Sequence, residues 1–297
     1  MERFIKAAVY LPSRLSQAVY ALAKRGMGRN VCEIRLRENM PLAFSTYNGC
    51  VFVNENMETC KMENAIITAP RDIIYTVNCL CSGSVYRYGD TLKKGYIVTP
   101  DGIRAGICGH ALYENGVLSV VDNYTGINIR IPRRIEGCAA PVMRNIALEG
   151  LNSMLIFSSP GVGKTTLIRE MAIQLSRKYG VAVVDEKGEI LPACFAGDCG
   201  MCDILTGYSK PEGMELAVRM MSPQVIICDE IGMADDISAI LSVQNSGVPL
   251  IATVHCGTRE SLFSKPNIKR LCECGVFSRF VRLERGKDGM EIFIEKD

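Results

Sequence analysis

Residues 153–166 read SMLIFSSPGVGKTT, an apolar run followed by a glycine-containing loop and the start of a helical pattern. Gly161 and Gly163 keep side chains away from the loop, so several backbone N–H groups can reach a phosphate. Lys164 can place a positive charge against the β- and γ-phosphates, and Thr165 can offer a hydroxyl to Mg²⁺. The stretch therefore predicts a nucleoside triphosphate site between a buried strand and a helix.

The entry to this loop departs from the usual pattern G-x-x-x-x-G-K-[ST], because Ser158 stands at the first glycine position. Serine is small enough to end the strand without blocking the phosphates, so we expect an altered turn and a working loop. A chance turn of small residues is the alternative, and the flanking strand and helix patterns disfavour it. The residues expected to contact the nucleotide are Ser159, Pro160, Gly161, Val162, Gly163, Lys164, Thr165 and Thr166.

The composition is that of an ordinary folded protein. The chain has 297 residues, of which 48% are hydrophobic and 22% are charged, and its length suggests about two domains. A formal net charge of +2 lacks the electrostatic signature of a dedicated nucleic-acid-binding protein. The N-terminal stretch carries charges at Glu2, Arg3 and Lys6, so neither a secretory signal nor a membrane span is expected there. The 14 cysteines indicate a reducing environment, and hence the cytoplasm.

Three of these cysteines raise the question of a metal. Cys194, Cys199 and Cys202 have the C-x₄-C-x₂-C spacing that can open an iron–sulfur or other metal site. A fourth ligand is missing nearby, and Cys272 or Cys274 could supply it only if the fold brings them close. Free thiols in a loop are the preferred interpretation, and metal binding stays open.

The pattern of apolar and polar residues changes near residue 143. Residues 1–143 contain short alternating segments and Asn-Gly or Asp-Gly turns, which predict antiparallel hairpins in an α+β domain. Residues 144–297 alternate apolar runs with helical patterns, which predict an α/β domain with a parallel sheet. Its apolar runs are 153–157, 181–184, 225–228 and 249–254.

Acidic pairs follow two of these runs. Asp229 and Glu230 suit a carboxylate that holds Mg²⁺ and a carboxylate that orients the attacking water. Asp185 and Glu186 end another run, and the carboxyl ends of parallel strands share the edge where ligands bind. Glu186 and Glu230 therefore both remain candidates for the catalytic carboxylate. The expected metal ligands are Thr165, Asp229 and Asp185, and solvated strand ends are the competing interpretation.

His255 follows the run 249–254. A polar residue at the end of such a strand can respond to the γ-phosphate, so we expect a functional role. A structural histidine is the alternative, and we assign that role to His110.

These segments together resemble the stage III sporulation protein AA ATPases, relatives of the secretion and type IV pilus motor ATPases. The resemblance rests on SSPGVGKTT, VVDEKGEI, DILTGYSKPEGMELAVRMMSPQVIICDEIG and GVPLIATVHC, in this order. CEIRLRENMPL, TLKKGYIVTPDGIRAGICGHA and NIRIPRR extend it into the N-terminal part, so it covers nearly the whole chain.

The resemblance implies a RecA-like P-loop ATPase core with a smaller N-terminal α+β domain, ATP and Mg²⁺ as ligands, and a hexameric homo-oligomer. It also implies a cytoplasmic motor, peripheral at the inner face of a membrane. Its partners would be integral membrane proteins of a secretion-like channel apparatus between mother cell and forespore.

Residue by residue, Lys164 and Thr165 match the Walker A pair, Asp229 and Glu230 the Walker B pair, and His255 the histidine box. Asp185 and Glu186 lie where these ATPases have an acidic box. Arg104 and Arg130 are the best matches to arginines that reach the nucleotide of an adjacent site, where a guanidinium stabilises the transition state.

Two other function classes compete with this interpretation. A nucleic-acid-dependent RecA-type ATPase would use the same core, but we find no appended nucleic-acid module and the charge is nearly neutral. A nucleotide-gated scaffold without hydrolysis is the third class.

Overall fold

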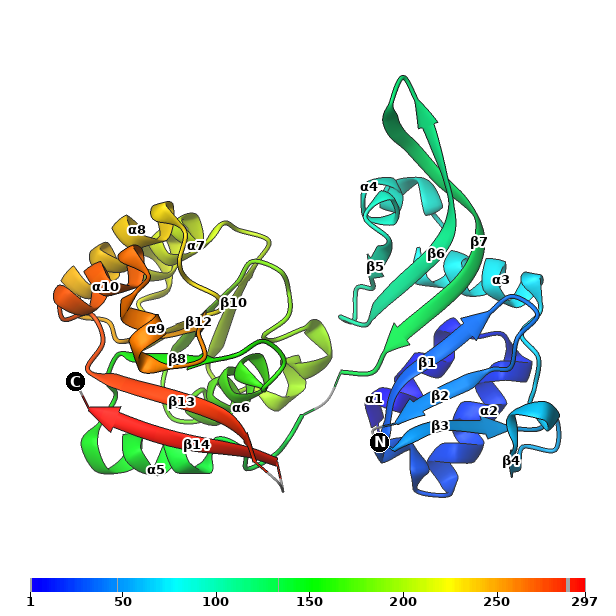
Figure 1. The fold of residues 1–297 in the computed structure, drawn as a ribbon, viewed down its shortest axis with the longest axis horizontal. Coiled ribbons are helices and arrows are strands. Elements are labelled where there is room, and N and C mark those ends of the chain that lie inside the picture. The colour runs from blue at the N-terminus through cyan, green and yellow to red at the C-terminus, as the bar shows by residue number, and fades with distance from the viewer. Residues whose placement is uncertain (1, 47, 133, 287–288, 297) are drawn as a thin grey trace. The chain divides into compact units, whose positions relative to one another are not determined.

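The computed structural model describes residues 2–46, 48–132, 134–286 and 289–296 (Figure 1). Contacts divide the chain into two compact units, Met1–Arg133 and Arg134–Asp297. This boundary precedes the expected one between residues 143 and 144, because helix α5 (Ala140–Glu149) packs Val142 and Ile146 into the core of the second unit.

The first unit is an antiparallel sheet packed against helices, with the strand order β4-β3-β2-β1-β7-β6-β5. Ile34 and Leu36 of β1 point into one core with Leu15 of α2 and Ile73 of α3. The α+β class expected here is confirmed. The strands are β1 (Val31–Arg37), β2 (Ala43–Thr46), β3 (Gly49–Val53), β4 (Thr59–Cys60), β5 (Tyr96–Val98), β6 (Arg104–Glu114) and β7 (Val117–Arg130). The α-helices are α1 (Glu2–Lys6), α2 (Ser13–Lys24), α3 (Pro70–Leu80) and α4 (Gly89–Lys93).

A long hairpin of β6 and β7 extends from this sheet (Figure 1). Its turn is Asn115-Gly116, where φ is 52° and 78°. Two consecutive positive φ angles are the geometry that an Asn-Gly hairpin turn favours. The local sequence therefore determines where this hairpin reverses.

The second unit is a mixed sheet with the order β10-β9-β11-β12-β8-β13-β14, in which β13 and β14 pair antiparallel and the other neighbours pair parallel. The strands are β8 (Met154–Ser158), β9 (Val181–Asp185), β10 (Cys202–Thr206), β11 (Val225–Cys228), β12 (Leu250–His255), β13 (Arg279–Gly286) and β14 (Gly289–Lys296). The other α-helices are α6 (Lys164–Leu175), α7 (Lys210–Leu216), α8 (Ala234–Asn245), α9 (Arg259–Phe263) and α10 (Pro266–Glu273).

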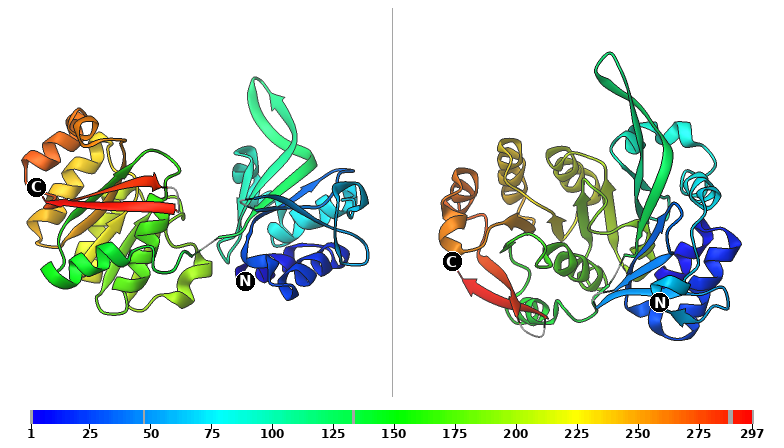
Figure 2. Two further views of the ribbon diagram at one scale, coloured as in Figure 1. Left: turned by 60° about the horizontal axis from the view of Figure 1, so that its bottom comes forward. Right: turned by 45° about the vertical axis from the view of Figure 1, so that its right-hand side comes forward.

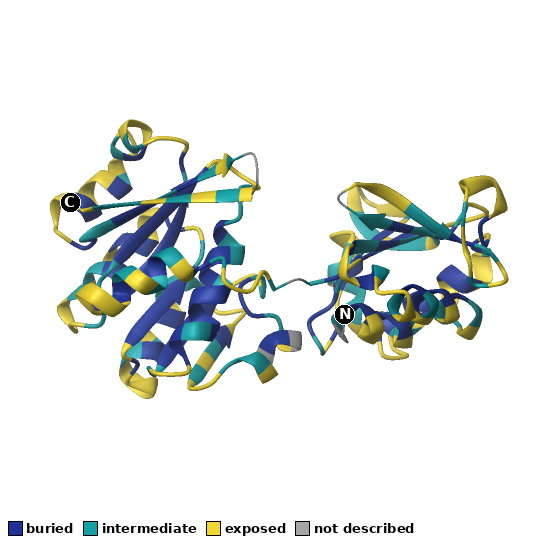
Figure 3. Ribbon diagram, turned by 90° about the horizontal axis from the view of Figure 1, so that it is seen from below, coloured by how far each residue is buried: buried dark blue, intermediate teal, exposed yellow. Residues whose placement is uncertain are grey.

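Helices cover both faces of this second sheet. Met154 and Ile156 of β8 pack in a core with α5 and α6, whereas Leu155 and Phe157 pack in the core that contains residues of α7, α8 and α10. Figure 2 shows the green helices and the yellow to orange helices on opposite sides of the strands. The central strands are buried along their length, as Figure 3 shows in dark blue. The expected α/β class with a largely parallel sheet is confirmed, because strands buried on both faces produce the continuous apolar runs of the sequence.

Candidate nucleotide site

The carboxyl ends of four parallel strands meet at one edge of the second sheet. Ser158, at the end of β8, pairs in register with His255, at the end of β12. Cys228, directly before Asp229, pairs in register with Val184, directly before Asp185. Because the strands are parallel, the loop after β8 and the polar residues after β9, β11 and β12 come to this same edge.

The loop between β8 and α6 has a backbone suited to phosphate. Gly161 has a φ of 76° and Gly163 of 128°, both in the left-handed region that glycine tolerates. Helix α6 begins at Lys164, immediately after Gly163. The N–H groups of its first turn, which have no partner within the helix, therefore face the loop and favour an anion.

Lys164 is nearly buried and already hydrogen-bonded. Its side chain donates to the Ser158 carbonyl at 3.0 Å, the Ser158 hydroxyl at 3.3 Å and the Ser159 carbonyl at 3.4 Å. Burial lowers the pKa of Lys164, and the negative charges of Asp229 and Glu230 oppose that shift. Ser158 thus acts as an acceptor for the lysine, and its hydroxyl also donates to the Ser159 carbonyl at 2.9 Å.

His255 lies between Lys164 and Glu230. The Lys164 ammonium lies 2.8 Å from Nδ1 of the imidazole, and Nε2 lies 3.3 Å from a carboxylate oxygen of Glu230. An ammonium can only donate, so Nδ1 accepts and the proton of a neutral ring is on Nε2, facing Glu230. One ring therefore connects Lys164 of the loop to a candidate catalytic carboxylate.

Asp229 is held by two threonines. Thr165 donates to one carboxylate oxygen at 3.3 Å, and Thr253 of β12 donates to the other. The Thr253 hydroxyl also accepts the backbone N–H of Glu230 at 2.8 Å, where Glu230 has a φ of 47°. No role for Thr253 was predicted from the sequence. Only its contact with the neighbouring strand shows that it supports this turn.

The carboxylate of Asp185 is engaged by backbone. It is buried, and it accepts N–H groups from Glu189 at 2.8 Å and from Ile190 and Leu191 at 2.9 Å. Burial raises the pKa of Asp185, while these three hydrogen bonds lower it. Because both oxygens already accept hydrogen bonds, the geometry indicates that Asp185 orders the segment 189–191. Its role as a metal ligand stays a prediction.

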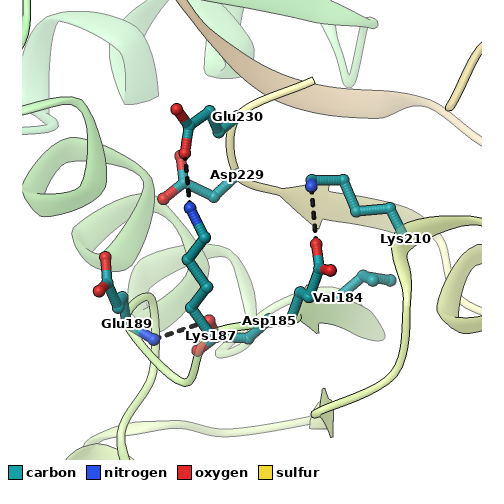
Figure 4. Close-up of a pocket in the computed structure, with 8 residues that line it drawn as sticks. Val184, Asp185, Lys187, Glu189, Lys210, Asp229 and Glu230 are labelled. Atoms are coloured by element: carbon teal, nitrogen blue, oxygen red, sulfur yellow. Dashed lines mark hydrogen bonds and ion pairs between the residues drawn. The ribbon is translucent and has the colours of Figure 1, made fainter. Parts of the chain in front are cut away.

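A pocket at the same edge contains two lysine–glutamate pairs (Figure 4). Lys187 donates to Glu230 at 2.9 Å, and Lys210 donates to Glu186 at 2.8 Å. The hydrogen bond from Lys187 lowers the pKa of Glu230. Sequence reasoning overlooked both lysines, although Lys187 directly follows the acidic pair at 185–186. The pocket is lined by Val184, Asp185, Glu186, Lys187, Glu189, Lys210, Asp229 and Glu230.

The two expected arginines lie in the first unit. Arg104 of β6 and Arg130 of β7 are register partners, so the fold places them side by side. The Arg104 guanidinium lies 4.6 Å from the centre of the Tyr96 ring, and Arg130 is exposed. Their action on a nucleotide stays a prediction.

The oxygen atoms near the loop suit a magnesium–nucleotide complex. Mg²⁺ prefers hard oxygen donors and usually takes one or two protein ligands together with phosphate oxygens and water. The Thr165 hydroxyl and the Asp229 carboxylate are such donors, 3.3 Å apart. Within the described ranges, no group of three or more His, Cys, Asp or Glu residues is placed to hold a metal ion. The Cys194 side chain lies outside what the structure describes.

Comparison with known proteins places these features in a family. The family model for "Sporulation stage III, protein AA" matches residues 18–294. Stage III sporulation protein AA of Bacillus subtilis (strain 168) is 30% identical over 291 residues, covering 94% of this chain and 91% of that protein. Protein SEEDLING PLASTID DEVELOPMENT 1 of Arabidopsis thaliana is 33% identical over 153 residues, which cover 49% of this chain and 22% of that protein.

Two solved structures share the fold. The Legionella pneumophila ATPase DotB superposes with a TM-score of 0.57 at 15% identity, covering 96% of this chain and 81% of that one. The pilus retraction motor PilT, solved with bound ADP, gives a TM-score of 0.62 at 13% identity and covers 92% and 81%. Among the helices that the structure describes, none has the length and hydrophobicity needed to span a membrane.

Proposed function

Because the chain belongs to the stage III sporulation protein AA family, we propose that it is a magnesium-dependent ATPase that drives a secretion-like channel apparatus between mother cell and forespore. The observation that carries the proposal is the connection of Lys164, His255 and Glu230 at the mouth of a phosphate-binding loop. Phosphoryl transfer needs a cation against the phosphates and a carboxylate beside the attacking water. Both groups are present at this edge.

In this mechanism the loop and the first turn of α6 bind the β- and γ-phosphates, and Lys164 turns from the Ser158 and Ser159 carbonyls to the phosphate oxygens. Glu230 orients a water for in-line attack on the γ-phosphorus and receives its proton, and ADP and phosphate leave. Mg²⁺, held by Thr165 and Asp229, would neutralise charge on the β- and γ-phosphates. His255 transmits this movement of Lys164 to Glu230, because its ring contacts both side chains.

We further propose that the active form is a homo-hexamer in which Arg104 and Arg130 complete the site of an adjacent subunit. Two proteins that share the fold, the ATPase DotB and the pilus retraction motor PilT with bound ADP, support an ATPase or motor role. The register pairing of the two arginines supports a joint action, because both guanidinium groups originate from adjacent positions. The proposed location is the cytoplasmic face of a membrane, with integral membrane proteins as partners.

The proposal is tested by phosphate release from full-length protein separated by oligomer size, with ATP and Mg²⁺. We expect hydrolysis in the hexamer fraction and a loss of about 10²-fold or more in Lys164→Ala. A verified hexamer that binds ATP without releasing phosphate would instead identify a nucleotide-gated scaffold. Stimulation by single-stranded nucleic acid, with none by membrane-protein partners, would favour the nucleic-acid-dependent class.

The arginines are tested by mixing two inactive variants. If Arg130 acts on a neighbour's nucleotide, then Lys164→Ala and Arg130→Ala subunits together form some complete sites and recover part of the activity. Hydrolysis that stays as low as in either variant alone contradicts action between subunits.

A further inference from the structure

Thr253 lies in the buried part of β12 and has no role in the mechanism proposed above. Its exposed fraction is 0%, and β12 lies between β8 and β11 in the sheet. Two residues earlier on the same strand, Ile251 packs in the core that contains residues of α6, so Thr253 points to the same face of the sheet. Valine has the same shape as threonine and would suit such a position. What threonine adds is a hydroxyl, and a buried hydroxyl needs hydrogen-bond partners.

The hydroxyl of Thr253 connects two residues that follow β11. It donates to one carboxylate oxygen of Asp229, and it accepts the backbone N–H of Glu230 at 2.8 Å. Because a backbone N–H can only donate, the proton of the hydroxyl is directed at Asp229. Hydrogen bonds that run in one direction through a shared hydroxyl strengthen each other, and a carboxylate acceptor strengthens them further. One buried group therefore orients the proposed Mg²⁺ ligand and the start of the next residue together.

The backbone of Thr253 holds the same turn. Its carbonyl accepts the N–H of Ile231 at 2.8 Å, so Thr253 binds the N–H groups on both sides of the Glu230 side chain. Glu230 has a φ of 47°, in the left-handed region that residues with a Cβ atom rarely adopt. This conformation determines where the Glu230 side chain leaves the backbone, and its carboxylate reaches Nε2 of His255 at 3.3 Å. The direction of the candidate catalytic carboxylate thus depends on contacts with Thr253.

We propose that Thr253 is a positioning residue for ATP hydrolysis, whose hydroxyl fixes the Asp229 carboxylate and the Glu230 turn as one unit. This inference rests on the proposed function. Thr165 also contacts Asp229, at 3.3 Å, but Thr165 is itself a proposed Mg²⁺ donor, whereas the contacts of Thr253 serve orientation. A displacement of about 1 Å in a reacting group can lower a rate about 10²-fold, so a hydroxyl that orients two such groups should act on kcat.

A pair of substitutions separates the hydroxyl from the packing. Thr253→Val keeps the shape and removes the hydroxyl, and Thr253→Ser keeps the hydroxyl. We expect Thr253→Val to lower kcat roughly 10- to 100-fold and to change the KM for ATP by less than about threefold, because the phosphate-binding loop is untouched. Thr253→Ser should recover most of kcat. Unchanged kcat in the valine variant, or an equal loss in both variants, would overturn the proposal.

Thr76→Val is the matched control. Thr76 is equally buried, but it lies in α3 of the first unit and donates within that helix, to the Asp72 carbonyl at 2.7 Å. This variant removes the same hydroxyl from a position away from the proposed site, so its kcat should equal that of the wild type. A loss as large as in Thr253→Val would mean that removal of any buried hydroxyl lowers the activity, and would contradict a positioning role.

Hydrogen–deuterium exchange of the nucleotide-free, full-length chain gives a readout that does not depend on hydrolysis. The Glu230 N–H loses its acceptor in Thr253→Val, so it should exchange at least about tenfold faster there, and Thr253→Ser should keep it protected. The Ile231 N–H is the internal reference, because its acceptor is the backbone carbonyl of residue 253 and is present in every variant. Equal protection of the Glu230 N–H in the wild type and Thr253→Val overturns the inference even if the chain hydrolyses ATP. A wild-type chain without hydrolysis contradicts the proposed function instead, and the exchange result then still decides whether Thr253 holds the turn.

Discussion

Nζ of Lys164 lies 2.8 Å from Nδ1 of His255, so the lysine of the loop and the histidine of the adjacent strand form one unit. Replacing His255 with alanine removes the acceptor for Lys164 and the contact with Glu230 together. A hydrogen bond to a charged group contributes about 1.5–3 kcal/mol, so we expect kcat to fall roughly 10- to 100-fold. Steady-state hydrolysis measures the loss. His255→Asn keeps an acceptor near the Nδ1 position and should recover part of it, and an unchanged kcat in the alanine variant would exclude the relay.

The two candidate carboxylates differ in their contacts, and amide substitutions distinguish them. Glu230 touches His255, whereas Glu186 is paired with Lys210. We expect Glu230→Gln to lower kcat by about 10²–10⁴-fold, as for loss of a general base, while ATP still binds. Glu186→Gln is the matched control and should cost less than about tenfold. The reverse ranking in single-turnover hydrolysis would transfer the catalytic role to Glu186.

Lys187 sets the protonation of Glu230. Its hydrogen bond holds the pKa of that carboxyl below the ordinary range, so removing the lysine should raise the pKa. In Lys187→Met the acid limb of the kcat/KM profile should therefore move to higher pH, because Glu230 must be ionised to act. Lys210→Met is the control, since Lys210 is hydrogen-bonded to Glu186 and lowers the pKa of Glu230 only through a smaller charge interaction, so its acid limb should move less. Identical profiles for the wild type and Lys187→Met would show that Glu230 is not the group that titrates.

A partly buried ion pair joins Arg134, the first described residue of the second unit, to Glu170 of α6. Arg134 donates to both carboxylate oxygens of Glu170, at 2.7 Å and 3.2 Å, and Gln174 donates to one of them at 2.6 Å. Burial raises the pKa of Glu170, but these hydrogen bonds outweigh burial and hold it below its ordinary value. Glu170→Gln leaves Arg134 without its main partner, so we expect the free energy of unfolding to fall by about 2 kcal/mol at neutral pH.

The loss of stability in Glu170→Gln should depend on pH. A carboxyl whose pKa is lower in the folded state stabilises the fold above its unfolded pKa, and this stabilisation is lost as the pH falls through the folded pKa. The deficit of Glu170→Gln relative to the wild type should therefore shrink in acid, as urea unfolding at several pH values can measure. Glu215→Gln, in the exposed pair with Arg219, should change stability by less than about 1 kcal/mol. A deficit that is constant with pH would mean that the pKa of Glu170 is the same in the folded and unfolded states, which would contradict the prediction.

The fold was predictable from the sequence because its signals are local. Fully buried strands such as β8 and β11 appear as unbroken apolar runs, and Asn115-Gly116 is sufficient to mark a hairpin. The edge where Lys164, Asp229 and His255 meet also followed, since parallel strands align their carboxyl ends.

The partners of these residues did not follow from the sequence. Lys187 and Lys210 reach their glutamates across distances of 43 and 24 residues along the chain, and no periodic pattern encodes such a contact. The contacts of Asp185 were not predictable either. The sequence predicts a metal ligand there, and only the structure shows that its oxygens accept three backbone N–H groups. Side-chain pairing depends on loop geometry, and burial decides which charges need a partner.

Ser158 and its neighbours compete with the proposed nucleotide for hydrogen bonds from Lys164. Four acceptors surround the three ammonium protons of Lys164: the Ser158 carbonyl and hydroxyl, the Ser159 carbonyl and the His255 ring. A phosphate must displace some of them, so its affinity is the difference between two sets of hydrogen bonds. Such intramolecular competition weakens every phosphate ligand, and it selects for the ligand that offers the lysine the most oxygen atoms, a triphosphate over a diphosphate.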